Sequence, residues 1–264
     1  MSKNQKPPRL TFFKYTTLAL LTFLPHGLSA QEKNAPPGPI AIFDGKTLSG
    51  WNVFCPPEDK EKKFWSVDNG TIQCDSRGKP KHKFSWLIHQ REFDDFELQL
   101  KVQCFEAKKG NSGIQIRSRW NPNIGKGWLN GPQIDIHPPS PYRTGFIYDE
   151  TRGVNHWISP VRPSHKLTEK EAFPNGKPKG WIFHYATEEK DLWNELKIRA
   201  VGTRITTYLN GVLITDYDGS GIMDDKLHKD ANVGMKGYIA LQLHSRDQLL
   251  IRFKDITVLP LTKK

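Results

Sequence analysis

The 264-residue sequence predicts an all-β protein built as a two-sheet antiparallel β-sandwich. Apolar and polar residues alternate over many short segments, which is the period-2 pattern of half-buried strands. Glycine- and proline-rich stretches separate these segments, and no apolar repeat of 3.6 residues continues for a useful length. About a dozen short strands with such loops between them are typical of two packed sheets.

The first thirty residues have the three-part pattern of a secretory signal peptide. A basic start precedes an uncharged apolar run over Tyr15–Leu24, and Ala30 offers a small residue before a cleavage site. The run is too short for a membrane-spanning helix, which needs about 20 residues; an uncleaved N-terminal anchor is the alternative. We therefore expect a signal peptide over 1–30, a Pro-rich linker over 31–39 and one domain over 40–264. The protein would be secreted or periplasmic, with no stable membrane insertion.

The charge balance does not indicate a nucleic-acid-binding protein. The formal net charge is +11, and four of the positive charges belong to the expected signal peptide. The remaining lysines are scattered over Gly- and Pro-rich loops, so no regular face gathers them into a basic groove. The sequence also lacks the motifs of nucleotide binding, phosphoryl transfer and serine hydrolysis. We expect no nucleic-acid partner.

Three cysteines, Cys55, Cys74 and Cys104, leave at least one thiol outside any intramolecular disulfide. One disulfide is possible, and the sequence does not indicate which pair would form it. Because there is no CxxC motif, a structural zinc site is not expected.

Strands are predicted in order along the chain wherever apolar residues recur at every second position. Phe96–Cys104 gives the longest alternation, with five apolar side chains on one face. The other strands are marked by Ile114 and Ile116, by Ile134 and Ile136, by Ile239, Leu241 and Leu243, and by Ile251, Phe253, Ile256 and Val258.

The clearest local element is a hairpin over Arg204–Tyr217. Asn210 and Gly211 tolerate the positive φ angles of a type I′ turn between two β-branched and aromatic runs. Trp193–Ala200 is expected to be the strand before it. Residues 153–180 and 218–236 are expected to be long loops, which commonly carry sites at the rim of a sandwich.

The strand faces opposite the apolar residues carry amides, imidazoles and carboxylates. An ordinary solvated strand would carry Lys, Glu, Thr and Ser there. Amides and carboxylates can share hydrogen bonds with sugar hydroxyls, and aromatic rings can stack on sugar C–H faces. We predict that these faces form a shared polar groove; an ordinary solvent-facing surface is the alternative. The groove residues would be Gln115, Arg117, Gln133, Asp135, His137, Tyr148, Glu150, Tyr238, Gln242 and His244, with Trp120, Trp128, Trp157 and Trp181 as candidate stacking platforms.

Short motifs in a fixed order extend over residues 41–260. They are Phe43–Trp51 (FDGKTLSGW), Asp95–Leu98 (DFEL), Asn111–Ser118 (NSGIQIRS), Gly131–Ile136 (GPQIDI), Thr144–Tyr148 (TGFIY), Trp193–Asn194, Tyr208–Val212 (YLNGV), Gly237–His244 (GYIALQLH) and Ile251–Ile256 (IRFKDI). On these motifs the sequence resembles the 3-keto-disaccharide hydrolase domain family, which is frequent in secreted bacterial proteins. Each motif alone is weak, but their order and spacing together are fairly specific.

The resemblance implies a concanavalin A-like jelly roll with a concave, sugar-facing sheet. It also implies a hydrolase or lyase activity on glycosides whose C3 hydroxyl has been oxidised to a ketone. This chain departs from the family pattern at two positions: it has Gln133 where many members have Glu, and Asp135 where they have Gln. The carboxylate therefore lies two residues further along the same strand face.

A ketone at C3 acidifies the C2 proton, because the resulting carbanion is an enolate. A general base would remove that proton, an acid would assist departure of the C1 aglycone, and water could then add. The expected catalytic residues are Asp135, Glu150 and His244. The expected substrate-binding residues are Asn111, Arg117, Gln133, Tyr148 and Gln242, with Arg117 also available to stabilise the enolate oxygen.

Structural interpretations of the same residues stay open. Asp135 can form a salt bridge with Arg117, Glu150 can pair with Arg152, and His244 can be an ordinary hydrogen-bonded residue. No cofactor is expected. A divalent metal ion is a secondary possibility, with Asp135, His137, Glu150 and His244 as donors.

The main alternative function is a non-catalytic carbohydrate-binding module, because jelly rolls serve both roles. A retaining glycosidase of the laminarinase kind would need two carboxylates about 5–5.5 Å apart. The segment Gln133–His137 offers one acid where that motif needs two Glu residues. A cell-surface interaction protein is the remaining option. The expected partner is an oligosaccharide or glycoside substrate, and the sequence does not indicate an oligomeric state.

Overall fold

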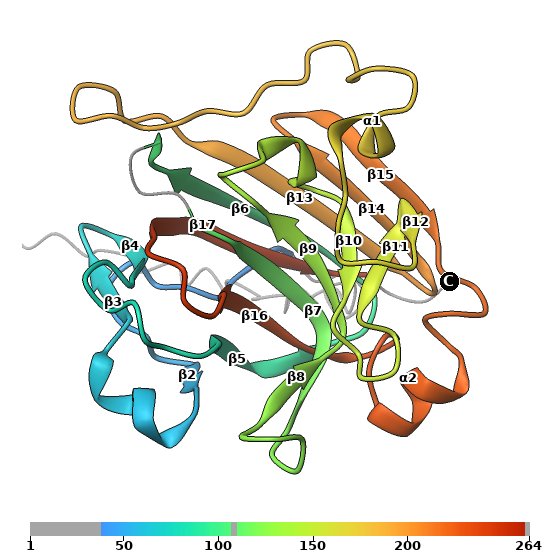
Figure 1. The fold of residues 1–264 in the computed structure, drawn as a ribbon, viewed down its shortest axis with the longest axis horizontal. Coiled ribbons are helices and arrows are strands. Elements are labelled where there is room, and N and C mark those ends of the chain that lie inside the picture. Colours follow the sequence, from blue (N-terminus) through green and yellow to red (C-terminus); the bar gives the residue numbers. More distant parts are fainter. Residues whose placement is uncertain (1–37, 107–109, 262–264) are drawn as a thin grey trace, which may run out of the picture. The chain divides into compact units, whose positions relative to one another are not determined.

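The computed structural model describes residues 38–106 and 110–261, so the expected signal peptide and most of the linker lie outside the described residues. The chain is all-β, as predicted, and its two antiparallel sheets form a jelly-roll sandwich (Figure 1). The few helices are short and lie in loops. None of the helices in the described ranges is long and apolar enough to cross a membrane.

Sheet 1 contains the elements that the sequence predicts most clearly. The predicted strand Phe96–Cys104 is β6 without any change of bounds. The predicted hairpin is β14 and β15, and its turn residues Asn210 and Gly211 have φ angles of +49° and +80°, as a type I′ turn requires. In spatial order, the strands are β15 (Val212–Asp218), β14 (Arg204–Leu209), β13 (Asn194–Val201), β6, β17 (Leu250–Pro260), β4 (Thr71–Asp75) and β3 (Trp65–Asp68), with β1 (Ile40–Ala41) also paired to β17.

Sheet 2 contains the segments in which polar side chains alternate with isoleucine and leucine. In spatial order, its strands are β12 (Val161–Arg162), β11 (His156–Ser159), β10 (Ile147–Asp149), β9 (Pro132–Ile136), β7 (Ser112–Asn121), β16 (Gly237–Leu243), β5 (Ser85–Phe93) and β2 (Trp51–Phe54). The short strand β8 (Trp128–Asn130) pairs with the end of β7, and this hairpin extends beyond the sheet (Figure 1). Its loop requires glycine at position 127, where φ is +101° and a Cβ would lie 1.9 Å from the Trp120 ring.

The core lies between the two sheets. Sheet 1 contributes residues such as Leu98 and Ile198, and sheet 2 contributes residues such as Ile114 and Ile134, all fully buried in one cluster. Burying such a side chain stabilises the fold by about 1.5–3 kcal/mol. Because successive strand residues point to opposite faces, anchoring the isoleucines in the core directs their polar neighbours to the outer face of sheet 2.

The two regions expected to be long loops are more structured than predicted. Residues 153–180 contain β11, β12 and the helix α1 (Glu169–Ala172), and residues 218–236 contain α2 (Lys226–Ala231). Two short 3₁₀ helices, η2 (Pro57–Lys62) and η4 (Pro141–Arg143), lie in other connections. All of these elements are too short to produce a recognisable period in the sequence, so their caps are the available signal. Asp225, for example, caps α2 by accepting a hydrogen bond from the His228 N–H at 2.8 Å.

The three cysteines are free thiols in the structure. Cys74 and Cys104 are buried in the core, and Cys55 is half-buried. The disulfide that the sequence left possible is therefore not formed.

Candidate functional site

The strand register aligns two rows of side chains across the outer face of sheet 2. Most of the polar groups lie on β10, β9, β7 and β16, whereas β5 and β2 contribute mainly large apolar side chains, with Asn52 as a polar exception. One row runs Asp135, Gly113, Gln242, Trp86 and Phe54, and the neighbouring row runs Tyr148, Gln133, Gln115, Ala240, Ile88 and Asn52.

Gly113 leaves space in the middle of the polar part. It pairs with Asp135 on one side and with Gln242 on the other. A Cβ at this position would lie 2.5 Å from the side-chain carbonyl carbon of Gln133, closer than real Cβ contacts. The absence of a side chain therefore lets the amide of Gln133 lie over the sheet.

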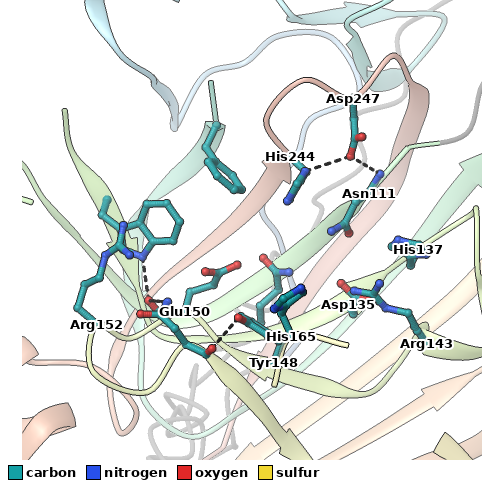
Figure 2. A pocket seen from close by; sticks show the side chains of 14 residues that line it. Asn111, Asp135, His137, Arg143, Tyr148, Glu150, Arg152, His165, His244 and Asp247 are labelled. Carbon is teal, nitrogen blue, oxygen red and sulfur yellow. Dashed lines mark hydrogen bonds and ion pairs between the residues drawn. The ribbon is translucent and has the colours of Figure 1, made fainter. Parts of the chain in front are cut away.

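A cavity of about 580 Å³, the main cavity, opens over this polar part. Figure 2 shows Asp135, His137 and Arg143 on one side, Arg152 on the opposite side, and His244 with Asp247 along a third edge. Six of the eight expected site residues line it: Asn111, Gln133, Asp135, Tyr148, Glu150 and His244. Gln242 lies fully buried in the same sheet face and contacts Glu150.

Glu150 is a buried carboxyl group with weak compensation for its charge. The residue is 7% exposed, and its carboxylate forms no ion pair within the described residues. Gln242 Nε2 donates to Glu150 Oε1 over a long 3.4 Å, while the Trp128 indole N–H donates to the Glu150 main-chain oxygen at 2.8 Å and helps to fix the backbone. Burial is the main cause that raises the pKa of Glu150 from 4.5 to about 7. The alternative interpretation, a pair with Arg152, does not apply in the described structure, where the Arg152 guanidinium stacks on the Trp128 ring.

Asp135 has a different environment in the same cavity. It is buried, and its Oδ2 accepts a hydrogen bond from Arg143 Nε at 3.0 Å. His137 follows the last residue of β9. Its Nδ1 accepts the Ser140 N–H over 2.9 Å, so the neutral ring carries the proton on Nε2. Burial lowers the pKa of His137, which favours this neutral form. This side of the cavity thus offers an ion pair and an imidazole N–H donor.

His244 is held by an acid three residues later in the chain. Its Nδ1 lies 3.2 Å from Asp247 Oδ2, and the same oxygen accepts the Asn111 N–H at 2.8 Å. Partial burial opposes the charged imidazolium, but the bond to Asp247 and the nearby acids outweigh it and raise the pKa of His244. The ring also makes an edge contact with Phe84, with centroids 4.7 Å apart. This arrangement favours a protonated imidazole at the cavity wall.

Several polar atoms around the cavity have no partner in the described part of the molecule. They are the side-chain oxygens of Asn111, Gln133 and Gln242, all buried. The hydroxyl of Tyr148 donates to the Asn155 carbonyl at 2.8 Å and keeps its lone pairs available. Buried acceptors without donors are costly. A ligand rich in hydroxyl groups would satisfy them.

Arg117 does not reach the cavity, so its expected position is wrong. Its side chain is fully buried, and its guanidinium donates to Asp95 Oδ1 at 3.0 Å and to main-chain oxygens of Asp94, Gly202 and Gly234. These bonds join separate loops at the end of the sandwich. Arg117 is therefore a structural residue.

The physical reason is a β-bulge in β7. The pairing with β16 shifts between Tyr238 and Ala240, and Arg117 has a φ angle of +48°. An extra residue in one strand reverses which face the following side chains occupy. The salt bridge between Asp135 and Arg117 that the strand alternation left open is therefore not formed. Asp135 pairs with Arg143 instead.

The main cavity also contains residues that sequence reasoning missed. Trp128 lines it, as a stacking platform would, whereas Trp157 is fully buried behind Arg143 and Tyr148. The missed lining residues lie at strand ends or in loops: Phe84, Arg143, Asn155, His165 and Asp247. The available signals are positional, since Arg143 lies between two family motifs and Asp247 follows the last residue of another by three positions.

The described residues contain no group of three or more His, Cys, Asp or Glu side chains arranged to hold a metal ion. Of the four donors considered from the sequence, Asp135 pairs with Arg143 and His244 with Asp247.

Comparisons with known proteins give one sequence relative and several structural ones. A 3-keto-disaccharide hydrolase of Bacteroides thetaiotaomicron is 34% identical over 80 residues, which cover 29% of this chain and 26% of that protein. A candidate glycosyl hydrolase from Parabacteroides distasonis superposes with a TM-score of 0.54 at 16% identity, over 85% of this chain and 94% of that one. A Bacillus subtilis protein of unknown function with a galectin-like fold gives a TM-score of 0.50 at 11% identity, over 82% and 92%. At these identities the structural likeness establishes the fold alone.

A family model described as the 3-keto-alpha-glucoside-1,2-lyase-like domain matches residues 38–259. The match spans both sheets and every residue of the main cavity. It confirms the resemblance seen in the sequence motifs. The chain belongs to the 3-keto-alpha-glucoside-1,2-lyase-like domain family.

Proposed function

We propose that this protein is a carbohydrate-active enzyme that cleaves 3-keto-glycosides by removing the C2 proton and releasing the C1 aglycone. The observation that carries the proposal is Glu150, a buried carboxyl group that faces a polar cavity and has a pKa of about 7. A general base or acid works best when its pKa lies near the operating pH. Family membership supports the substrate class, as does the name of the Bacteroides relative, a 3-keto-disaccharide hydrolase.

Glu150 is assigned the proton transfer at C2. In its ionised form the carboxylate takes the C2 proton, and the electron pair of the C–H bond moves into the enolate formed with the C3 carbonyl. The apolar part of its surroundings, which raises its pKa, also strengthens it as a base once it is ionised. The charge on the C3 oxygen then needs donors, and Arg143 and the Nε2–H of His137 line the same cavity.

His244 is assigned the protonation of the leaving group. The enolate expels the aglycone oxygen from C1, and the imidazolium of His244 gives that oxygen a proton, so the aglycone leaves as a neutral alcohol. Neutral His244 can then accept a proton from water as its oxygen adds to C1, and Glu150 returns its proton to C2. The sequence of steps hydrolyses the glycoside and restores both groups to their starting protonation states.

The direct test incubates the purified protein with a 3-keto-disaccharide and with its unoxidised parent, each with and without a chelator. We expect cleavage of the keto sugar alone. Cleavage of the parent alone would indicate an ordinary glycosidase. Binding of the sugars without cleavage of either would indicate a carbohydrate-binding module. Loss of cleavage in chelator would add a divalent metal to the mechanism.

We also propose that residues 1–30 are a signal peptide and that the enzyme works outside the cytoplasm. The support is the basic start, the short apolar run and the small residue at Ala30. Intact mass measurement of the protein from a bacterial expression host should show a chain that begins at Gln31 in the periplasmic or culture fraction. A full-length chain held in the membrane would contradict cleavage.

A further inference from the structure

A second and smaller cavity, the side cavity, adjoins the main cavity. Its volume is about 300 Å³, and Phe84, Trp128 and Arg152 line both. The two cavities are therefore adjacent, with two aromatic rings and a guanidinium at their common boundary.

The lining of the side cavity differs sharply from that of the main cavity. Away from the shared wall its surface is largely carbon, from residues that include Pro56, Trp86 and Ile124. Lys83 and Lys126 complete the lining with Gly125 and Gly127, and the Lys126 ammonium pairs with Glu58. Trp86 stacks on Phe84, with ring centroids 5.5 Å apart and planes 12° apart, and meets Trp128 edge-on at 5.4 Å. Such flat apolar walls suit an aromatic ring better than a hydroxylated sugar. A cavity of about 150 Å³ already accommodates benzene in another protein.

Two residues that line the side cavity, Trp86 and Arg152, carry polar groups without a hydrogen-bond or ion-pair partner in the described residues. Trp86 is 1% exposed, and its indole N–H has no hydrogen-bond partner in the described residues. The guanidinium of Arg152 lies 3.8 Å from the centroid of the Trp128 ring and forms no ion pair within the described ranges. A buried donor without an acceptor is costly, so it indicates a place for a ligand oxygen.

We propose that the side cavity is the aglycone subsite and that it takes an aromatic aglycone of the phenolic or benzylic class that carries an oxygen substituent. The proposal rests on the function proposed above, because it places the C1–O bond at the Phe84 and Trp128 wall. When that bond breaks, its electron pair stays on the aglycone oxygen, which takes the proton of His244. Since the His244 ring contacts Phe84, the acid stands at the junction of the two cavities. The released aglycone is neutral and lies against carbon.

The experiment compares the 3-keto derivatives of benzyl and methyl glucoside. Both leaving groups are alcohols of similar acidity, so the ratio of their kcat/KM values measures recognition of the ring. We expect the benzyl glycoside to be favoured about 10- to 100-fold, the range expected for burying an aromatic side chain. Ile124 is a half-buried residue of the β7–β8 loop, and Ile124→Asp should bring the ratio close to one. Ile222→Asp, a matched change on an exposed loop outside both cavities, should leave it unchanged.

A ratio close to one in the wild-type protein, or a preference that survives Ile124→Asp, would overturn the aglycone subsite and leave the proposed function standing. If neither keto glycoside is cleaved, the proposed function fails, and calorimetric titration with unoxidised 4-methoxybenzyl glucoside and methyl glucoside decides the subsite alone. If the aromatic glycoside binds more tightly and Ile124→Asp removes this advantage, the aglycone subsite is supported. Equal binding of the two glycosides overturns it. We expect 4-methoxybenzyl glucoside to bind more tightly than benzyl glucoside. Trp86→Phe, once its thermal transition is shown to be unchanged, should remove this difference in affinity.

Discussion

Asp149 and Glu150 are neighbours in the chain, both buried, and their surroundings are opposite in kind. Asp149 Oδ2 lies 2.7 Å from His228 Nε2, and its Oδ1 accepts the Thr151 N–H at 2.8 Å. Glu150 faces the main cavity, and among residues 38–106 and 110–261 its carboxylate accepts only the long bond from Gln242. Adjacent residues at a strand end point to opposite sides, so one acid meets α2 and the other meets the cavity.

The difference separates a structural acid from a reactive one. Burying a charge is costly unless a partner and hydrogen bonds compensate it. Asp149 has that compensation and anchors α2 to β10, whereas the fold leaves Glu150 without it. A buried acid whose compensation is incomplete is the one available to exchange a proton with a ligand.

The largest expected effect is on catalysis at Glu150. Glu150→Gln keeps the shape of the side chain and an oxygen for Gln242, but it cannot take a proton. We expect kcat for a 3-keto-disaccharide to fall by about 10²- to 10⁴-fold, with sugar binding changed far less. Glu195→Gln, an exposed change on sheet 1, is the control and should retain activity. Retained turnover in Glu150→Gln would move the base to Asp135 or His244.

Loss of the partner of the structural acid, Asp149, should reduce the stability of the fold. His228→Ala leaves Asp149 buried without its partner, and we expect the free energy of unfolding to fall by about 3–5 kcal/mol. Burial opposes the charge on His228, but the bonds to Asp149 and Asp225 outweigh it and raise its pKa above 6.5. The contribution is therefore fully present below pH 6.5 and is lost as pH rises through the raised pKa.

Urea unfolding of wild type and His228→Ala between pH 6 and pH 9 measures this dependence. The stability difference should be largest at pH 6 and should shrink at higher pH. His184→Ala, a half-buried histidine with no side-chain hydrogen bond in the described structure, should show little change at any pH. A difference independent of pH would mean that His228 acts through packing and not through its charge.

Glu150 should also make the stability of the fold depend on pH. Stability should fall as pH rises, whereas a salt-bridged acid makes stability rise with pH. Its pKa is raised from 4.5 to about 7 in the folded chain, so the folded state loses stability as pH rises through this interval. Glu150→Gln removes that loss. We expect the variant to be more stable than wild type by roughly 3 kcal/mol at pH 8 and of equal stability near pH 4.5, measured by urea unfolding. A variant less stable at pH 8 would show that the carboxylate is compensated in the folded chain.

The fold was largely predictable because its signals are local. The alternation over Phe96–Cys104 and the turn at Asn210 and Gly211 depend on neighbouring residues only, and both match the structure. The short helix α2 was missed because its six residues produce no period, although they provide the histidine that pairs with Asp149. Local patterns thus identify long strands and tight turns, but not single-turn elements whose stability comes from tertiary contacts.

The cavity was predictable where strand alternation continues unbroken, and unpredictable where it does not. Gln133 and Asp135 share a face because β9 is regular. Arg117 was misplaced because a one-residue bulge reverses the faces of β7, and nothing in the composition of that strand marks the bulge. Arg143 comes from a loop whose path no periodicity describes. Its place beside Asp135 depends on the whole sandwich.

The smallest expected effect is a shift in the pH profile of activity, and it depends on how His244 differs from His228. His228 is enclosed between two carboxylates. The half-exposed ring of His244 contacts one carboxylate, that of Asp247, and its Nδ1 also lies 3.1 Å from the Ser245 main-chain oxygen. In the proposed mechanism Glu150 must be ionised and His244 protonated, so kcat/KM should rise with pH through about 7 and fall once His244 loses its proton. Asp247→Asn removes the charge that raises the pKa of His244. The alkaline limb of the profile should therefore move to lower pH, with activity near pH 6 changed least, while the stability profile assigned to His228 stays as in wild type. An alkaline limb that does not move would exclude His244 as the acid, because loss of the Asp247 charge must lower the pKa of His244.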